Sequence, residues 1–318
     1  MPEPILRALR PDEWDAVAEV VWSSTNAWYQ RNRGVPAFAG GPETCRLFPE
    51  VYEGLDPGHC VVAEDPASGR LMGSCFYRRR ETHVSLGILN VHPDFFGRGV
   101  AGRVLRFVTD FADHLALPVR LVSSAMNLDS FSLYSRAGFV PRGVFATMMV
   151  GEPKEGEGAY GLAASAASHS AGIVRPIHAP DVDVMGELEL RTSHIRRTKD
   201  YALFAENRAG IWHTLVHADV DGRVDGWLAS VAHPASTMIG PGVMANEASA
   251  AALLAAQVAY HRALGRTPMV LVPTWWPGLV SRAYAWGLRN VEVHVAQVRG
   301  KFDGWDGVVI PTFMPETG

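Results

Sequence analysis

The fold is decided by residues 91–103, which read VHPDFFGRGVAGR. This stretch joins an apolar run to a glycine-rich turn and then to the start of a helical pattern. Its glycines allow a tight turn, because a residue without a Cβ adopts positive φ at no steric cost. Free N–H groups at a helix N-terminus attract anionic oxygens, and Arg98 and Arg103 add positive charge nearby. The stretch therefore predicts a site for a pyrophosphate.

Residues 97–102 also match the dinucleotide-binding pattern G-x-G-x-x-G, but their surroundings argue against such a site. A dinucleotide site has its glycines directly after a strand and an acidic residue about twenty positions further on. Here residues 93–96 separate the strand from the glycines, and residues 121–124 hold no carboxylate. We therefore do not expect a nicotinamide or flavin site. An ordinary glycine-rich turn is the simpler alternative.

Helix and strand signals alternate along the chain on both sides of this turn. After it, apolar residues at helical spacing from position 104 to 115 predict a helix that ends before Pro118. Asn127 and Gly138 are typical of the two ends of a second helix. A helix is expected from Pro11, and the aromatic-rich residues 23–50 are expected to be irregular. The predicted strands are residues 5–9, 60–64, 71–77, 83–91 and 119–124, and a run up to residue 150.

Two motifs in this region resemble those of the GCN5-related N-acetyltransferases, the GNAT superfamily. The cofactor loop of that family, Gln/Arg-x-x-Gly-x-Gly/Ala after a V-x-P strand end, is matched by residues 96–101 behind residues 91–93. A later motif, N-x-x-(A/S)-x-x-L-Y-x-x-x-G-F, is matched by residues 127–139. One departure is Phe96, where the family usually has Gln or Arg. The resemblance predicts an α+β fold, with a mixed, mostly antiparallel twisted sheet flanked by helices.

The resemblance implies acetyl-CoA, or another acyl-CoA, as the cofactor. Its pyrophosphate would lie on the backbone amides of residues 96–101. In similar enzymes the thioester carbonyl is held by N–H groups of a splayed strand, which corresponds here to residues 89–91. Asn127 would either contact the cofactor or cap its helix. The candidate cofactor-binding residues are Leu89, Asn90, Val91, Phe96, Gly97, Arg98, Gly99, Val100, Ala101, Gly102, Arg103, Asn127 and Ser130.

Acyl transfer to an amine requires a neutral amine, a stabilised oxyanion and a proton for the departing thiolate. In similar enzymes a tyrosine at the position of Tyr134 supplies that proton, and a phenol with a pKa near 10 is suited to this role. The glutamate that many similar enzymes carry on the strand before the turn is absent, so His83 and Glu81 are the nearest candidate bases, alongside deprotonation through water. The candidate acceptor-site residues, for which simple packing is an equal alternative, are Trp28, Tyr29 and Phe38.

Length, charge and cysteine content indicate which general class of protein this chain belongs to. A length of 318 residues with 47% apolar and 19% charged residues suggests two soluble domains. A net charge of −4 argues against general nucleic-acid binding. The sequence shows no secretory or membrane-spanning segment, so a cytoplasmic protein is expected. Cys45, Cys60 and Cys75 are scattered, which fits free thiols in a reducing compartment and not a metal site.

The second half of the chain repeats the order of the first. Residues 173–176 resemble residues 5–8 and also precede a helical pattern. Residues 279–288 resemble 131–139 in the same way. The sequence therefore predicts two tandem GNAT-like domains. Their expected extents are residues 1–150 for a catalytic acyl-CoA-binding domain, 151–171 for a linker and 172–318 for a degenerate second domain.

The second copy lacks the residues that carry the chemistry. Aligning Pro118 with Pro268 places Glu247 and Ser249 at the positions of Gly97 and Gly99. A carboxylate directed at a phosphate would repel it. One acyl-CoA per chain is therefore expected. The second domain would complete the acceptor pocket, form a homodimer surface or bind an effector.

The sequence thus predicts an N-acetyltransferase that moves an acetyl group from acetyl-CoA to a small-molecule or peptide amine by direct attack. Two alternatives stay open. One is a CoA-binding sensor without turnover, which is favoured by Phe96 and the missing glutamate. The other is an acyl-CoA decarboxylase with the same fold, which would need no acceptor amine.

Overall fold

The computed structural model describes residues 3–150 and 172–314, and these form two compact units. Of the described residues, unit 1 contains 3–121 and 313–314, and unit 2 contains the rest. The predicted linker lies outside the described residues. The units do not divide at residue 150, because strand β6 (Val140–Val150) pairs with strands of the second half. The domain limits drawn from the sequence repeat stay a prediction.

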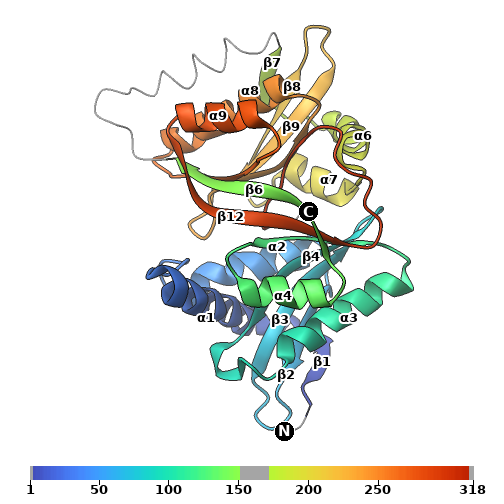
Figure 1. Cartoon of the computed structure of the whole chain (residues 1–318), viewed down its shortest axis with the longest axis vertical. Helices are drawn as coiled ribbons and strands as arrows, with labels where there is room; N and C mark the ends of the chain where they lie inside the picture. The colour runs from blue at the N-terminus through green and yellow to red at the C-terminus, as the bar shows by residue number, and fades with distance from the viewer. Residues whose placement is uncertain (1–2, 151–171, 315–318) are drawn as a thin grey trace. The chain divides into compact units, whose positions relative to one another are not determined.

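The sheet of unit 1 follows the order β1-β2-β3-β4-β5. Figure 1 labels the first four of these strands. The first four strands pair antiparallel, whereas β4 and β5 run parallel. The mixed, mostly antiparallel sheet predicted from the sequence is therefore confirmed. The strands are β1 (Ile5–Ala8), β2 (Cys60–Glu64), β3 (Leu71–Arg79), β4 (Val84–Val91) and β5 (Val119–Ser124), whose last three residues belong to unit 2.

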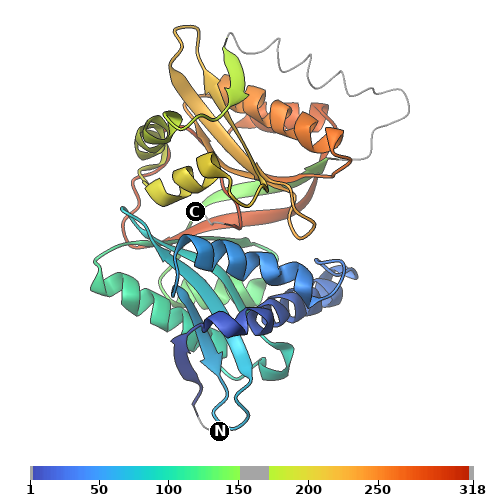
Figure 2. The ribbon, with the colours of Figure 1, turned by 180° about the vertical axis from the view of Figure 1, so that it is seen from behind.

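Helices cover both faces of this sheet. Helices α1 (Trp14–Arg33) and α2 (Leu47–Leu55) lie on one face, and α3 (Val100–His114) lies on the other (Figures 1 and 2). The expectation of an irregular segment over residues 23–50 is wrong. No glycine or proline interrupts the sequence between Trp14 and Gly34, so α1 continues until Gly34 ends it with a φ of 75°.

Unit 2 has the strand order β12-β6-β11-β10-β9-β8-β7, and β13 lies beside β10. Strands β7 to β10 pair antiparallel, β10 and β11 pair parallel, and β6 pairs antiparallel with both β11 and β12. The bounds of the strands not yet given are β7 (Ile173–Pro176), β8 (Trp212–Ala218), β9 (Val224–Val231), β10 (Met238–Met244), β11 (Met269–Pro273), β12 (Leu288–Arg299) and β13 (Val308–Ile310).

The core of unit 2 forms where α8 packs on the sheet. Leu253, Leu254 and Val258 of α8 are fully buried and cluster with Ile239 and Val272 of the strands. Helices α6 and α8 cover opposite faces of β9 and β10 (Figures 1 and 2). The described helices of this unit are α4 (Leu128–Arg136), α6 (Asp181–Ser193), α7 (Thr198–Glu206), α8 (Glu247–Ala263) and α9 (Pro277–Ala285).

An ion pair repeated in both halves supports the duplication. Arg7 Nη2 lies 2.6 Å from Glu13 Oε1, and Arg175 Nη1 lies 2.7 Å from Asp181 Oδ2. In each case the arginine is on the first strand of its half, and the carboxylate is six residues later at the start of a helix. Arg7 lowers the pKa of Glu13 to about 2 through this bond. Strand order and this shared contact together confirm a tandem arrangement of one fold.

Candidate functional site

Strand β4 leaves part of one edge open. Its parallel pairing with β5 is confined to Val84 and Ser85, and further along, the described strands pair only with its β3 side. A register shift opposite Cys75 and Tyr77 places an extra β4 residue between Leu86 and Leu89, which is a β-bulge. Beyond the paired end, β4 therefore presents backbone N–H and C=O groups to a ligand. This is the region in which residues 89–91 were expected to hold a thioester.

At the turn after β4, several backbone amides have no acceptor among the described residues. Gly97 and Gly99 have φ values of 75° and 74°, and Gly99 is the N-cap of α3. A Cβ at either position would meet nothing within 4 Å, so the backbone conformation and not space requires glycine. The N–H of Arg103 bonds to the Gly99 carbonyl at 3.2 Å. Residues 100–102 precede that first helical bond, and their N–H groups have no protein acceptor among the described residues.

The backbone amide of Phe96, which was expected to bind the pyrophosphate, already has an acceptor in the protein. Its N–H donates to the Pro93 carbonyl at 3.2 Å, so this amide is already engaged. The expected row of amides therefore begins after Phe96. Phe96 is 50% exposed.

Charged residues surround the turn but are largely paired. The Arg98 guanidinium lies 5.1 Å from the centre of the Phe95 ring. Arg70 bonds to Asp94 at 2.9 Å and thereby lowers the pKa of that carboxyl group. Arg103 Nη2 lies 2.8 Å from Glu3 Oε1 in a solvent-exposed pair. Because exposed ion pairs contribute about 0–1 kcal/mol, Arg103 can exchange Glu3 for a phosphate at little cost.

The acceptor candidates lie on and beside α1. Trp28 and Tyr29 are half-buried on this helix, with ring centres 5.0 Å apart. Phe38 is held against α1 by Asn26, whose Oδ1 accepts the Phe38 N–H at 2.8 Å and whose Nδ2 donates to the Phe38 carbonyl at 3.1 Å. Asn90 Nδ2 donates to Thr25 Oγ1 at 3.3 Å, which joins the end of β4 to the same helix. Their role in acceptor binding stays a prediction.

The two candidate bases occupy different environments. His83 is fully buried, and its ring nitrogens lie 3.1 Å from Thr82 Oγ1 and 3.1 Å from Ser85 Oγ. Glu81 is exposed in the turn between β3 and β4. Burial does not favour His83 as a base, because a proton taken from an amine must return to solvent. The base stays a prediction.

Tyr134 and its neighbours belong to unit 2. Tyr134 is 6% exposed on α4 and packs edge-on against Phe139, with ring centres 5.7 Å apart. Asn127 caps this helix, because its Oδ1 accepts the N–H of Ser130 at 3.1 Å. Of the two alternatives for Asn127, capping is thus present. The role of Tyr134 as proton donor stays a prediction.

Sequence reasoning missed the polar residues that β12 brings to the end of β5. Glu292 is almost fully buried and accepts a hydrogen bond from Ser124 Oγ. Gln297 Oε1 accepts from Ser123 Oγ at 3.1 Å. About 170 residues separate these partners along the chain. No local pattern in the sequence signals such a contact.

The start of α8 differs from the start of α3, but not at the residues that the sequence alignment paired. Asn246 is the N-cap of α8 as Gly99 is the N-cap of α3, so Asn246 and not Ser249 stands at the position of Gly99. Asn246 Oδ1 accepts the N–H groups of both Ala248 and Ser249 at 2.9 Å. The helix amides that would meet a phosphate are therefore satisfied by the protein itself. Glu247 Oε1 lies 3.6 Å from Arg282 Nη1 and adds negative charge at this position.

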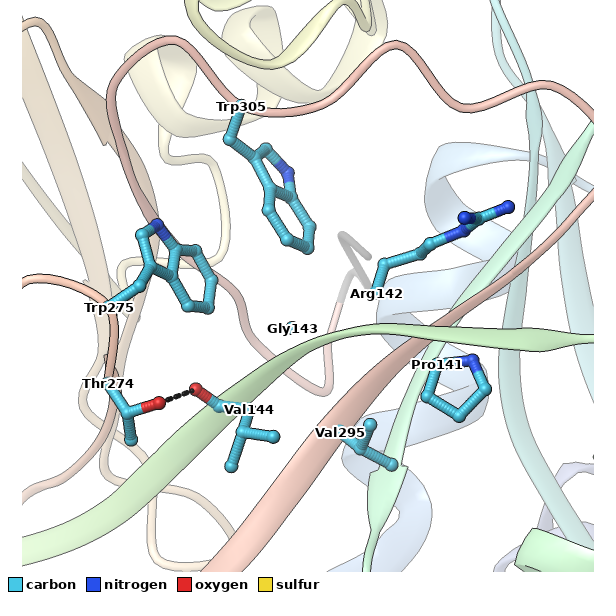
Figure 3. A pocket seen from close by; sticks show the side chains of 8 residues that line it. All are labelled: Pro141, Arg142, Gly143, Val144, Thr274, Trp275, Val295 and Trp305. Carbon is cyan, nitrogen blue, oxygen red and sulfur yellow. Dashed lines mark hydrogen bonds between the residues drawn. The ribbon is translucent and has the colours of Figure 1, made fainter.

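An aromatic hollow of about 490 Å³ lies elsewhere in unit 2, along β6 (Figure 3). Trp275 and Trp305 stack with ring centres 4.8 Å apart. A Cβ on Gly143 would lie 2.6 Å from the Trp305 ring, so only glycine lets both rings cover this strand. Thr274 Oγ1 donates to the Val144 carbonyl at 2.8 Å and fixes the loop that carries Trp275 (Figure 3).

Neither a reactive thiol nor a metal site is found in the part of the chain that the structure describes. Cys45, Cys60 and Cys75 are buried free thiols, and burial raises the pKa of Cys45 to about 12, so it is unreactive. No group of His, Cys, Asp and Glu in the described ranges is placed to hold a metal ion. Over the same ranges, none of the helices has the length and apolar character needed to cross a membrane.

A family model for the acetyltransferase (GNAT) family matches residues 18–139, which include the turn and α3. Residues 18–139 form a GNAT domain. A putative acetyltransferase from Pyrococcus horikoshii has a similar structure, with a TM-score of 0.70, 15% identity and coverage of 99% of this chain and 96% of that one. A tandem GNAT protein from the clavulanic acid biosynthesis pathway gives a TM-score of 0.63 at 13% identity, over 95% and 100% of the two chains.

At these identities the likeness shows the fold alone, and both halves of the chain share the tandem GNAT fold. One curated relative, the UPF0157 protein YqkA of Bacillus subtilis (strain 168), is 33% identical over 90 residues. That match covers 28% of this chain and 26% of the relative, so the chain spans about a quarter of that protein's length.

Proposed function

We propose that this protein is an N-acetyltransferase that transfers the acetyl group of acetyl-CoA to an amine. The observation that carries the proposal is the open edge of β4 next to the uncapped start of α3. The amides of residues 100–102 suit the pyrophosphate, and Arg98 and Arg103 supply compensating charge. The pantetheine arm contains two amide groups, which match a free strand edge. The GNAT family assignment of this segment supports the same cofactor.

The reaction is a direct attack. The amine nitrogen bonds to the thioester carbon, the C–S bond breaks, and CoA leaves as a thiolate. Backbone N–H groups near Leu89 would stabilise the oxyanion. Tyr134 would protonate the thiolate, and the proton lost by the amine would pass to Glu81 or to water.

A sensor that binds CoA without turnover is the second candidate. Two observations favour it. Phe96 stands where the family usually has a polar Gln or Arg, and the candidate base His83 is buried away from solvent.

A panel of amines distinguishes the two functions. We expect acetyl-CoA to release thiol faster with at least one small amine, amino acid or lysine peptide, measured with a thiol reagent. Calorimetry with CoA is the parallel measurement. Binding of CoA without thiol release for any acceptor would support the sensor. Carbon dioxide release from malonyl-CoA without an amine would instead support the decarboxylase, and absence of CoA binding would reject all three.

Restoring the usual family residue at Phe96 provides a further prediction. Phe96→Arg places a cation beside the pyrophosphate, and an exposed charge contact of up to about 1 kcal/mol corresponds to about two- to fivefold tighter binding. Calorimetry should show a lower Kd for CoA and a steeper dependence on salt concentration. Phe96→Gln is the uncharged control and should show no change in salt dependence. Weaker binding by both variants would mean that the phenyl ring itself contacts the cofactor.

A further inference from the structure

The second half contains an edge that corresponds to the open edge of β4. Strand β10 pairs in parallel with β11 only at Met238 and Ile239, just as β4 pairs with β5 only at its first two residues. The two halves share this strand order, so residues 242–244 of β10 take the place of the open part of β4. In the first half this is where the pantetheine arm is proposed to bind.

In the second half this edge is occupied by the protein itself. Strand β13 pairs antiparallel with β10, through Gly242 with Ile310 and through Met244 with Val308. It also contacts β11, so it fills the space where β10 and β11 separate. The other edge of the same β10 residues is taken by β9. Every residue of this part of β10 therefore has strand partners on both sides.

The contact between β13 and β10 is close and apolar. Val308 and Ile310 are fully buried and belong to the same core cluster as Leu253 and Val272. A Cβ on Gly307 would lie 2.5 Å from the Met244 carbonyl oxygen, and one on Gly240 would lie 2.6 Å from the Pro311 oxygen. Burying each of the two apolar side chains contributes about 1.5–3 kcal/mol, so β13 is not easily displaced.

We infer that β13 takes the place of a pantetheine arm in the second half, and that this half is thereby closed to acyl-CoA. The inference rests on the proposed function, because the pantetheine position is set by the first half. The cap of α8 is an independent observation that agrees with it. Asn246 satisfies two helix amides at the place where a pyrophosphate would bind, and the Glu247 carboxylate, which is paired with Arg282, stands beside them. The positions that correspond to the pantetheine arm and to the pyrophosphate are thus occupied by β13 and by the cap of α8.

Hydrogen exchange of the full chain, with and without saturating acetyl-CoA, tests this inference directly. In the free protein, peptides covering residues 239–245 and 306–312 should exchange as slowly as β9. Acetyl-CoA should slow exchange in peptides covering residues 86–103 and leave both second-half peptides unchanged. Fast exchange of β13 in the free protein, or a change there when acetyl-CoA is added, would overturn the inference. Absence of protection at residues 86–103 would instead count against the proposed function.

A variant provides a second test. Gly99→Glu is introduced to silence the first site, and Asn246→Gly with Glu247→Gly then removes the side-chain cap and the carboxylate from the start of α8. If β13 closes the cleft, this triple variant gives no acetyl-CoA-dependent rise in Tm, and a cooperative melting curve shows that it is folded. A rise in Tm with acetyl-CoA would show that the cap and charge at the start of α8, and not β13, excluded the cofactor.

Discussion

The Gly99→Glu variant is expected to lose acetyl-CoA-dependent thermal stabilisation. A glutamate at this position adds a carboxylate beside the pyrophosphate and forces a non-glycine residue to adopt a φ of 74°. Binding at 100 times Kd stabilises a protein by about 2.7 kcal/mol, so the loss is measurable as a change in Tm. The measurement is a melting curve with increasing acetyl-CoA.

Gly222→Glu is the matched control for backbone strain. Gly222 has a φ of 78° and, like Gly99, has nothing within 4 Å of a built Cβ. It is an exposed residue between β8 and β9. This variant should keep the full acetyl-CoA-dependent rise in Tm. Ser249→Glu would be a poorer control, because Ser249 is fully buried and a charge there would destabilise the fold. An unchanged rise in Tm in Gly99→Glu would reject the pyrophosphate assignment.

Tyr134→Phe is expected to lower kcat by about 10²- to 10⁴-fold, the range typical of a lost general acid. The Kd for acetyl-CoA should stay unchanged, because the phenyl ring still packs against Phe139. Steady-state kinetics with the best acceptor amine and calorimetry with CoA measure the two quantities separately.

Tyr284→Phe is the control, since Tyr284 is 52% exposed on α9 of the second half. It should retain wild-type kcat. Wild-type turnover by Tyr134→Phe would mean that water or another group protonates the thiolate. A large loss of acetyl-CoA affinity in that variant would point to a binding role for the hydroxyl.

The local elements near the glycine-rich turn of residues 97–99 were well predicted by the sequence. The strand over residues 119–124 and the strand that ends at Val150 occur as expected, because alternating composition and flanking turn residues act over short distances. The turn was predicted for the same reason: the positive φ of Gly97 and Gly99 is a property of the residues themselves. The predicted helix α1 is too short. Its aromatic residues suggested an irregular segment, although the sequence contains no glycine or proline before Gly34.

The sequence also predicts that the second half lacks the residues that would hold a cofactor, from Glu247 and Ser249 aligned with Gly97 and Gly99, whereas the structure has Asn246 at the N-cap position of Gly99. It did not indicate the closing of the cleft by β13, which is three residues long and pairs with a strand more than sixty residues earlier. The burial of His83 was equally hidden, because a single histidine beside a strand has the same local signal whether it is solvated or enclosed.

The sequence by itself determined the GNAT match over residues 18–139, the glycine turn that precedes α3 and the duplication of one fold. These features depend on residue types at fixed spacing, which are local properties of the chain. Only the tertiary structure decided which strand edges are open and which are filled. Among the described residues, β4 beyond Ser85 keeps a free edge, β10 is covered by β13, and β6 pairs with β12. The physical reason is that any exposed strand edge can form backbone hydrogen bonds with any other. The residues of one strand therefore do not determine which strand will pair with it.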